Sequence, residues 1–542
     1  MSATASERVD TTPGSATPAS AHSDPARITA ALAAIDPPAL VARLTATSGR
    51  TIDIVSPVTG AVLHTLPRSD AADVARAAEA ARAAQRAWRD AGPAHRRRVL
   101  LRAHDELVAR KERLLDAVQL ETGKTRGQAY EEWFNAAAAI RYAALSAGRA
   151  VRVRRRRAGI PLVMQARVRV SPKQLVGIIT PWNYPPSLTA MDVAPALAVG
   201  CAVVQKADDH GALSILLVRE AFAAAGLPEA VWGVVAGPGE EIGSAVIDAA
   251  DHVAFTGSTA TGRTVAERAA RRLIGASLEL GGKNPLLVLD DVDVEKAAAD
   301  AAYACFSSAG QLCVSTERVI VLRGVADRFV SAFAERVAGL TPGVALDYGT
   351  DVGSLTTAAQ LERVREHVDD AVAKGARVLA GGRALPEIAP FVYAPTVLAE
   401  VPEEAICARQ ETFGPVVSVT VVDDEEAAIA RANDTEYGLA ASVLTGSRRR
   451  GRRVATRLVA GSVNINEGYR ASFSAVDAPM GGRRQSGLGR RNGAEGLARY
   501  LETTTVAEAT GLLQLPRTGA EFRRLVGPMA LLLRVLRIAH RR

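Results

Sequence analysis

Short apolar runs alternate with helical patterns between Gln174 and Thr256, and this alternation limits the fold more than any other feature of the chain. Consecutive parallel strands need a crossover, usually a helix, and the helices then cover the faces of the sheet. Strands and helices are predicted in turn at residues 175–180, 193–199, 202–205, 213–225, 231–235, 241–249 and 252–256. The sequence therefore predicts an α/β fold built on a parallel sheet.

A second α/β cycle follows at about residues 286–463, so the chain of 542 residues divides into more than one domain. Between the N-terminal helices and the first cycle lies the basic run Arg152–Arg157, followed by the alternating stretch Gln165–Val170. Alternation of apolar and polar residues predicts a half-exposed strand. The charge of this region suits a solvated arm or a subunit contact.

Charge and cysteine content exclude some classes of protein. The net charge is +8, but the seven Arg and one Glu of residues 511–542 account for +6, so the body is nearly neutral. We therefore expect no nucleic-acid-binding core. Four Cys in so long a chain do not form a disulfide framework or a spacing typical of zinc sites. They indicate a reduced, cytoplasmic compartment and no bound metal.

The two ends of the chain differ from the body. Residues 1–25 are rich in Ala, Ser, Thr and Pro, lack the pattern of a secretory signal and are predicted to be disordered. The stretch Leu525–Arg537 is apolar and basic by turns, and no apolar run reaches the roughly 18–20 residues that a spanning helix needs. The basic amphipathic tail at 511–542 is expected either to lie on a membrane surface or a partner, or to be a packed or loose tail.

Cys313 is the candidate nucleophile. A free Cys is usually a small buried hydrophobe, but the small residues at 307–310 leave room for the backbone to approach a ligand. Thirty-four residues upstream, Glu279 ends an apolar segment and precedes Gly281 and Gly282. A thiol that attacks a carbon and a carboxylate that takes a proton would form a covalent catalytic pair.

Loops after the predicted strands supply further candidates, because parallel sheets bind ligands at the carboxyl ends of their strands. Asn183, in the loop 180–186, offers an amide donor for a developing oxyanion, although this loop could also be only a rigid aromatic–proline turn. Asp209 suits ribose hydroxyls. Gly257 and Ser258 open a helix that could meet a pyrophosphate. No segment is a strict GxGxxG fingerprint.

Together the motifs resemble the aldehyde dehydrogenase superfamily, and they follow the family's order between about residues 50 and 505. They are Pro-Trp-Asn at 181–183, Lys206, Phe-Thr-Gly-Ser at 255–258, Glu-Leu-Gly-Gly-Lys-Asn-Pro at 279–285, Gly-Gln-Leu-Cys at 310–313, Glu-Thr-Phe-Gly-Pro at 411–415 and Pro-Met-Gly-Gly at 479–482. Within the family the chain looks most like actinobacterial proteins assigned as NADP-type succinate-semialdehyde dehydrogenases, on segments 304–307 and 315–318 and on the basic tail.

The resemblance implies a Rossmann-type parallel-sheet cofactor domain, an α/β catalytic domain and a small β oligomerisation arm. The implied ranges are 26–150 and 171–278 for the dinucleotide-binding domain, 279–475 for the catalytic domain, and 151–170 with 476–510 for the arm. It also implies a homodimer or homotetramer, as in the family.

Carried over residue by residue, the resemblance implies oxidation of a small-molecule aldehyde to a carboxylic acid with NAD or NADP. Cys313 would attack the aldehyde carbon, the Asn183 side chain and the Cys313 N–H would hold the oxyanion, and Glu279 would activate water. That carboxylate favours hydrolysis over transfer to coenzyme A. Lys206 and Glu411 would bind the two riboses, and the cofactor groove would be lined by Trp182, Asp209, Gly257, Ser258, Leu280 and Phe413.

Three departures from the family pattern concern the cofactor and the pocket. The family commonly has Pro where Ala207 stands, Glu where Asp209 stands in NAD-preferring members, and Phe where Met480 stands. At a partly exposed separation near 4 Å, like charges repel by on the order of 1–4 kcal/mol. Asp209 would therefore repel the 2′-phosphate of NADP, which favours NAD.

Succinic semialdehyde is the predicted substrate. Arg470 falls where the family builds part of its aldehyde tunnel, so it is expected either to meet a substrate carboxylate or to be a surface Arg on a loop. The alternatives are a broad-specificity, fatty or aromatic aldehyde enzyme with a membrane-associating tail, and a non-phosphorylating glyceraldehyde-phosphate enzyme. An inactive scaffold protein is a further alternative, against which the intact Cys313, Glu279 and Asn183 argue.

Overall fold

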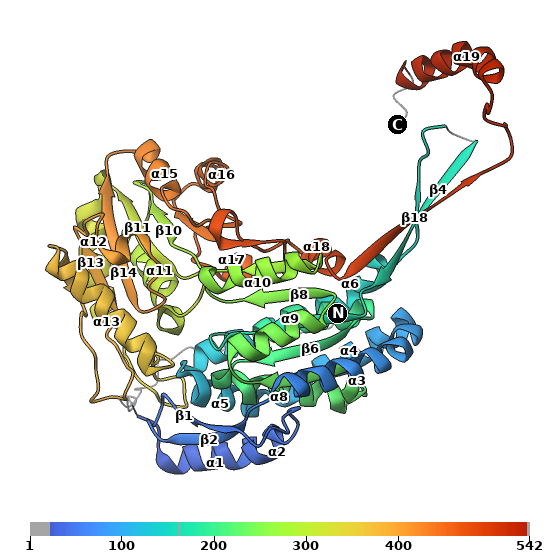
Figure 1. The fold of residues 1–542 in the computed structure, drawn as a ribbon. Coiled ribbons are helices and arrows are strands. Elements are labelled where there is room, and N and C mark those ends of the chain that lie inside the picture. The colour runs from blue at the N-terminus through green and yellow to red at the C-terminus, as the bar shows by residue number, and fades with distance from the viewer. Residues whose placement is uncertain (1–21, 161–162, 539–542) are drawn as a thin grey trace, which may run out of the picture.

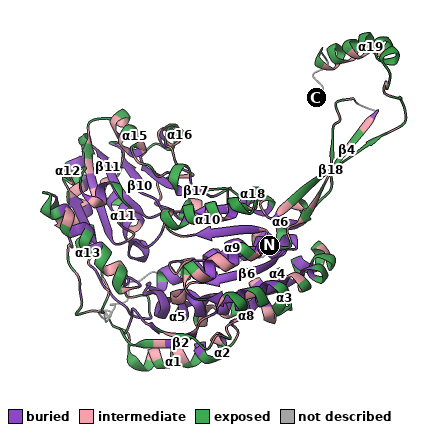
Figure 2. Ribbon diagram, in the orientation of Figure 1, coloured by how far each residue is buried: buried purple, intermediate pink, exposed green. Residues whose placement is uncertain are grey.

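The computed structural model describes residues 22–160 and 163–538. Two α/β bodies lie against each other, and a thin β arm leads away from them to a C-terminal helix (Figure 1). Burial is concentrated in the sheets and in the helices packed on them, whereas the arm and the C-terminal helix are mostly exposed (Figure 2). Most of the segment predicted to be disordered, residues 1–21, lies outside the described residues.

The first body is built on a six-stranded sheet with the order β17-β9-β8-β5-β6-β7, in which only β17 is antiparallel to its neighbour. The predicted α/β alternation is confirmed here. The strands are β5 (Leu175–Ile179), β6 (Ala202–Ala207), β7 (Trp232–Ala236), β8 (His252–Thr256), β9 (Gly275–Glu279) and β17 (Gly487–Leu488). The crossover helices are α7 (Pro185–Val199), α8 (Ala212–Ala224), α9 (Ser244–Ala249) and α10 (Thr259–Arg271).

Helices cover both faces of this sheet. Helix α3 (Ala71–Asp90) packs with α9 and α10 on one face, and α7 and α8 pack on the other. Beneath α7 and α8 lie α4 (Gly92–Ala109), α5 (Lys111–Thr122) and α6 (Arg126–Ala150). Every residue of α7 is buried, because this helix lies between the sheet and α4 and α6. The first elements of the chain, which precede α3, are α1 (Pro25–Ile35), α2 (Pro37–Val41), β1 (Thr51–Val55) and β2 (Val62–Pro67).

The second body is built on a seven-stranded sheet with the order β12-β13-β14-β11-β10-β15-β16, parallel except at β12. Helices α11 and α12 cover one face, and α15 and α16 cover the other. Its elements are β10 (Asn284–Val288), α11 (Val294–Phe306), β11 (Thr316–Leu322), α12 (Ala326–Ala338), α13 (Ala358–Ala373), β12 (Arg377–Ala380), β13 (Thr396–Ala399), α14 (Ile406–Arg409), β14 (Val416–Val422), α15 (Glu425–Asn433), β15 (Ala440–Leu444), α16 (Arg448–Ala455), β16 (Ser462–Ile465) and α17 (Arg470–Phe473).

The chain returns from the second body to the first before it forms the arm. Gly487–Leu488, which were expected in the arm range 476–510, pair with Leu278 and Glu279 at the edge of the first sheet. The helix α18 (Gly493–Ala498) then packs on α6 and α7. Arg491 fastens this return, because its guanidinium donates to both oxygens of the buried Asp192 on α7 at 2.9 and 2.8 Å.

The arm is a three-stranded antiparallel sheet of β18 (Leu501–Ala509), β4 (Met164–Pro172) and β3 (Arg154–Arg156). The predicted strand at 165–170 is therefore present and runs slightly further in both directions. Its pairing with β18 is continuous from Pro172↔Leu501 to Met164↔Ala509. Helix α19 (Gly519–Ile538) follows, and none of its residues is buried. Within the described residues no helix is long and apolar enough to cross a membrane.

Candidate active site

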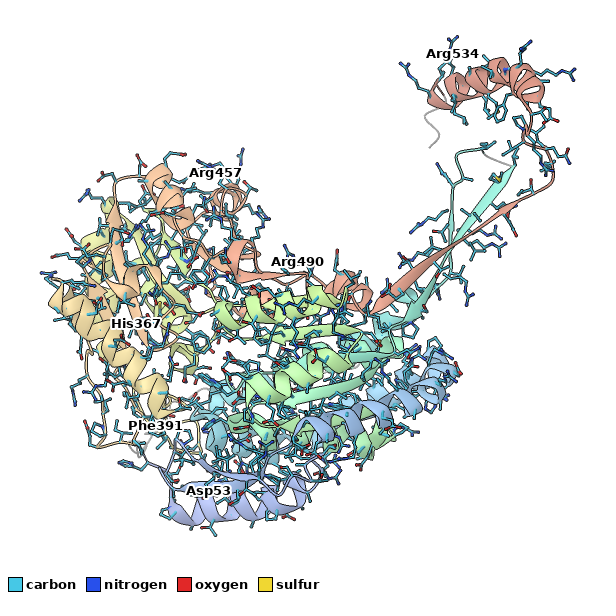
Figure 3. The ribbon with its side chains drawn as sticks, viewed as in Figure 1. Asp53, His367, Phe391, Arg457, Arg490 and Arg534 are labelled. Carbon is cyan, nitrogen blue, oxygen red and sulfur yellow. The ribbon has the colours of Figure 1, made fainter. Side chains whose placement is uncertain are left out.

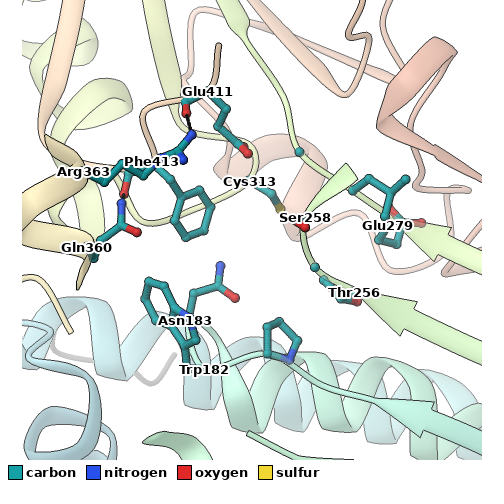
Figure 4. A pocket seen from close by; sticks show the side chains of 14 residues that line it. Trp182, Asn183, Thr256, Ser258, Glu279, Cys313, Gln360, Arg363, Glu411 and Phe413 are labelled. Atoms are coloured by element: carbon teal, nitrogen blue, oxygen red, sulfur yellow. Dashed lines mark hydrogen bonds between the residues drawn. The ribbon is translucent and has the colours of Figure 1, made fainter. Parts of the chain in front are cut away.

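A cavity of about 260 Å³ lies where the two bodies meet, at the carboxyl ends of β5, β8 and β9 (Figure 4). This is the edge at which parallel sheets bind ligands. The first sheet contributes the loop after β5, the turn before α10 and the end of β9, and the second body contributes the Cys313 loop, α13 and the loop before β14. The lining residues are Pro181, Trp182, Asn183, Thr256, Gly257, Ser258, Glu279, Leu280, Gly281, Cys313, Gln360, Arg363, Glu411 and Phe413.

The loop that carries Cys313 is held in an unusual backbone conformation. After α11 ends, Ser308, Ala309 and Gly310 have φ values of 53°, 52° and 71°. Left-handed backbone costs free energy for residues other than glycine, so neighbouring contacts must hold it. A side chain at Gly310 would collide with the Gly414 carbonyl, and the Ser308 hydroxyl is hydrogen-bonded to the Tyr184 hydroxyl at 2.7 Å.

Asn284 fastens the same loop from the other side. Its Nδ2 donates to the carbonyls of Cys313 and Ser315, both at 2.7 Å, and its Oδ1 accepts the N–H of Ala440 at 3.0 Å. Because Asn284 is the first residue of β10, the strand itself sets the position of the thiol. Asn284 belongs to the Glu-Leu-Gly-Gly-Lys-Asn-Pro motif, but its position in the sequence did not indicate this role.

The thiol and the carboxylate of the proposed pair both have raised pKa values. Cys313 opens onto the cavity, yet the surrounding protein withdraws it from bulk water, and this burial raises the thiol pKa to about 12, with further contributions from the charges of Glu279 and Glu411. Burial raises the pKa of Glu279 to about 7, although the Arg491 charge opposes the shift. At neutral pH the thiol is therefore protonated, and Glu279 is divided between its acid and base forms.

Glu279 and Asn183 keep hydrogen-bonding capacity for a group in the cavity. The Glu279 carboxylate receives no hydrogen bond from the described residues. Asn183 Nδ2 donates to the Gln311 carbonyl at 3.1 Å. A primary amide has two N–H donors, so one remains for a ligand. The arrangement offers a nucleophile, a base and an oxyanion donor.

The remaining walls fit a nicotinamide dinucleotide. Ser258 caps α10 by accepting the Thr261 N–H at 3.2 Å, so the N-terminus of this helix, which suits a pyrophosphate, lies at the cavity. Trp182 and Phe413 meet edge to face with ring centroids 5.7 Å apart, which gives an apolar wall. Glu411 accepts the Gly282 N–H at 2.9 Å, and a side chain at Gly281 would collide with that carboxylate.

A buried ion pair that the sequence analysis missed supports the loop of Glu411 and Phe413. Lys283 pairs with Glu317, and the Glu317 carboxylate accepts the N–H groups of Thr412 and Phe413 at 2.9–3.0 Å. A Glu at the start of the apolar strand β11 was the available signal, because buried carboxylates require partners.

Two side chains of α13, which were not predicted from the sequence, hold the same loop. Gln360 donates to the carbonyl of Phe413 at 2.7 Å, and Arg363 donates to the carbonyl of Glu411 (Figure 4). Both side chains line the cavity. Their positions on an ordinary amphipathic helix gave no signal in the sequence.

Lys206 and Asp209 do not line the cavity. Lys206 lies near the end of β6, and Asp209 lies in the turn that follows this strand. Lys206 is buried, with Nζ 3.9 Å from the Asp208 carboxylate. Asp209 accepts a hydrogen bond from Arg68 at 2.8 Å, and both side chains are mostly buried. A guanidinium from the N-terminal region thus stands beside the Asp209 carboxylate and offsets the charge that was expected to repel a 2′-phosphate.

Arg470 also lies outside the cavity lining, and its charge is met by carboxylates. Its guanidinium donates to both oxygens of Glu467 at 3.1 and 3.0 Å and lies 3.8 Å from Glu131. It stacks 4.1 Å above the ring of Tyr303. The structure thus gives Arg470 intramolecular partners that neither of the two expectations included.

Comparison with known proteins places the chain in a family. Residues 44–506 match the aldehyde dehydrogenase family, so the chain belongs to it. A Mycobacterium ulcerans protein named putative succinate-semialdehyde dehydrogenase [NADP(+)] 2 is 46% identical over 461 residues, 85% of this chain and 88% of that protein. A betaine aldehyde dehydrogenase of Cereibacter sphaeroides is 37% identical over 86% of this chain and 96% of its own.

Solved structures agree with this assignment. Betaine aldehyde dehydrogenase of Staphylococcus aureus in complex with NAD+ superposes with a TM-score of 0.85 and 29% identity, covering 91% of this chain and 99% of its own. An Escherichia coli NADP-dependent enzyme superposes with a TM-score of 0.82 and 34% identity, covering 86% and 96%. The predicted family and fold are confirmed, and the protein is an aldehyde dehydrogenase that uses NAD or NADP.

Replacing Asn284 should separate positioning of the thiol from folding. We expect Asn284→Ala to lower kcat on the order of 10²-fold, because a displacement near 1 Å at a reacting atom has such an effect. We also expect a changed rate of Cys313 alkylation by iodoacetamide, followed by peptide mass spectrometry, with an unchanged fold by circular dichroism. Asn433→Ala is the matched control, since the Asn433 side chain likewise bonds to backbone groups, those of Arg457 and Val459, away from the active-site cavity. Equal kinetics in the two variants would refute the role of Asn284.

Proposed function

We propose that the protein oxidises succinic semialdehyde to succinate by covalent catalysis at Cys313. The observation that carries the mechanism is the convergence of Cys313, Glu279 and Asn183 on one cavity from three separate segments. The Cys313 sulfur adds to the aldehyde carbon as its proton leaves through Glu279 or water. The oxyanion that forms receives hydrogen bonds from Asn183 Nδ2 and the Cys313 N–H.

A bound NAD or NADP would supply the acceptor for the hydride on the carbon attached to Cys313, and loss of this hydride converts the Cys313 adduct to a thioester. Glu279 then takes a proton from water, and the resulting hydroxide attacks the thioester carbon. The C–S bond breaks, the Cys313 sulfur regains its thiol form, and the carboxylic acid leaves. A carboxyl with a pKa of about 7 suits this cycle, because it takes and releases a proton near neutral pH.

The proposed cofactor contacts lie on the walls of the cavity, at the end of β6 and in the turn that follows β6. The N-terminus of α10, at Gly257 and Ser258, would face the pyrophosphate. Glu411 and Lys206 would bind the two riboses, and Asp209 would border the adenosine ribose. The apolar side chains of Trp182, Leu280 and Phe413 would line the groove.

The oligomeric state and the cellular compartment of the protein are also proposed here. The arm leaves β18 and β3 as edge strands, whose unpaired backbone groups suit strand addition by a second copy, so we propose a homodimer or homotetramer. All four cysteines are free thiols, which supports a reducing cytoplasmic compartment.

The pH dependence should report the ionisation of Glu279. Because the base form is required, turnover should rise about tenfold per pH unit below about 7 and level off above it. Glu279→Gln should lower kcat 10²–10⁴-fold, the usual range for a general base, and should remove this ascending limb. The exposed Glu295→Gln is the matched control. An ascending limb that persists in Glu279→Gln would assign it to another group.

Arg68 should determine how tightly the enzyme binds NADP+. Without the guanidinium, Asp209 would face a 2′-phosphate alone, so Arg68→Gln should weaken NADP+ binding by about tenfold or more while NAD+ binding changes little. Dissociation constants from fluorescence titration measure this without turnover. Arg50→Gln removes a nearby exposed partner of Glu241 and serves as control. Equal losses for both cofactors would contradict the role of Arg68.

Two observations bear on which aldehyde is the substrate. The Mycobacterium ulcerans relative carries a succinate-semialdehyde name, which supports an acidic aldehyde. The pairing of Arg470 with Glu467 favours a second candidate, a neutral aldehyde, because a substrate carboxylate would have to displace Glu467.

Steady-state kinetics of succinic semialdehyde and of aliphatic and aromatic aldehydes, each with NAD+ and NADP+, test the substrate. We expect the highest kcat/KM for succinic semialdehyde and a KM about tenfold higher for this substrate alone in Arg470→Ala. An unchanged KM excludes Arg470 from substrate binding. A higher kcat/KM for a neutral aldehyde in the unmodified enzyme would establish the second candidate.

A further inference from the structure

Most residues of the C-terminal helix α19 are exposed, and only Leu525, Met529, Leu532 and Leu536 are half-buried. It lies beyond the end of the arm, away from both bodies (Figure 1), and none of its residues is buried. Val526, Leu531 and Leu533 are each 62% exposed. An apolar cavity of about 350 Å³ lies between one face of this helix, the segment that precedes it and Ile160 at the arm tip, and Phe522, Leu525 and Met529 of α19 line it.

The apolar side chains of α19 cover a wide arc. At 3.6 residues per turn, the apolar residues between 525 and 536 occupy roughly 220° of the circumference. A helix that packs on a globular core usually needs a stripe of about 100°. The arc contains Leu525, Val526, Met529, Leu531, Leu532, Leu533, Val535 and Leu536.

Three of the four arginines of α19 occupy the opposite sector. Arg523, Arg534 and Arg537 fall within roughly 60° of one another around the helix, whereas Arg524 falls inside the apolar arc. Within the described residues, these guanidiniums have no carboxylate partner. The Glu521 carboxylate instead accepts the backbone N–H groups of Arg517 and Thr518. The described part of the tail, residues 511–538, therefore carries five Arg and one Glu, a net charge of +4, and the whole tail to residue 542 has a formal charge of +6.

The arm extends this positive surface. Arg154, Arg155 and Arg156 on β3 and Arg167 and Arg169 on β4 are all exposed. In the described part of the chain none of them pairs with a carboxylate. On the second body, by contrast, the exposed Arg457 pairs with Glu426, whereas Arg534 extends from α19 into solvent (Figure 3).

We propose that α19 binds in the plane of an anionic lipid surface, with its apolar arc at the headgroup–acyl boundary and its arginines at the lipid phosphates. A basic amphipathic helix of this kind gains from apolar burial and from attraction to anionic headgroups. Long Arg side chains can reach the phosphates while their stems stay apolar.

Two other partners fit less well. A second copy of α19 would cover only a narrow seam of the apolar arc and would bring two tails of charge +6 together. A nucleic acid would meet the arginines but leave the exposed leucines in water. An anionic lipid surface provides a partner both for the apolar arc and for the arginines of α19.

Co-sedimentation of the full-length protein with phosphatidylcholine vesicles, with and without phosphatidylglycerol, tests the proposal. The unmodified protein should bind only the anionic vesicles and dissociate in high salt. The variant Arg534→Glu with Arg537→Glu should lower the partition coefficient by about tenfold or more, and so should Leu532→Glu with Leu536→Glu. Aldehyde oxidation in solution should stay unchanged, which shows that the variants fold.

A matched control changes the net charge equally at another place. Arg448→Glu with Arg449→Glu alters two exposed arginines of α16 and should shift vesicle binding by less than about twofold. Absence of binding to anionic vesicles, or an equal loss in this control, overturns the proposal. If removal of residues 511–542 lowers the molar mass by light scattering while vesicles bind neither form, the tail contacts a second copy instead.

Discussion

The short crossing between the two sheets determines the geometry of the site. Glu279 is the last residue of β9, and Asn284 is the first residue of β10. Four residues separate them, so the first sheet places the carboxylate and the second sheet, through Asn284, places the Cys313 loop. Lys283 lies in the same crossing and, through Glu317, supports the loop of Glu411 and Phe413. One covalent segment thus sets Glu279, the Cys313 loop and part of the cavity wall relative to each other.

Burial gives these groups their proton affinities. The protein withdraws Glu279 and Glu411 from water, which raises their pKa values to about 7 and about 8. Glu317 instead is held by Lys283 and by two backbone N–H groups, as an enclosed carboxylate requires. Two carboxyls that exchange protons near neutral pH therefore line the cavity, and the buried Glu317 supports the loop of Glu411 and Phe413.

Local sequence patterns predicted much of this molecule. The alternation in residues 174–256 anticipated the parallel sheet, and β8 begins and ends at the predicted residues. Motif order identified the family, and the structure brings Cys313, Glu279 and Asn183 to one cavity. The missing parts are contacts between distant segments. Arg68 and Asp209 are 141 residues apart, and β17 is two residues long, so neither pairing leaves a pattern in the chain.

The central claim is that oxidation proceeds through a bond between Cys313 and the substrate carbon. Rapid mixing of enzyme, succinic semialdehyde and cofactor, acid quench within the first turnover, and peptide mass spectrometry test it directly. We predict a succinyl adduct on the peptide that contains Cys313, with its amount matching the NADH or NADPH formed in that turnover. Formation of reduced cofactor without any adduct on Cys313, or with the adduct on another residue, would contradict the account.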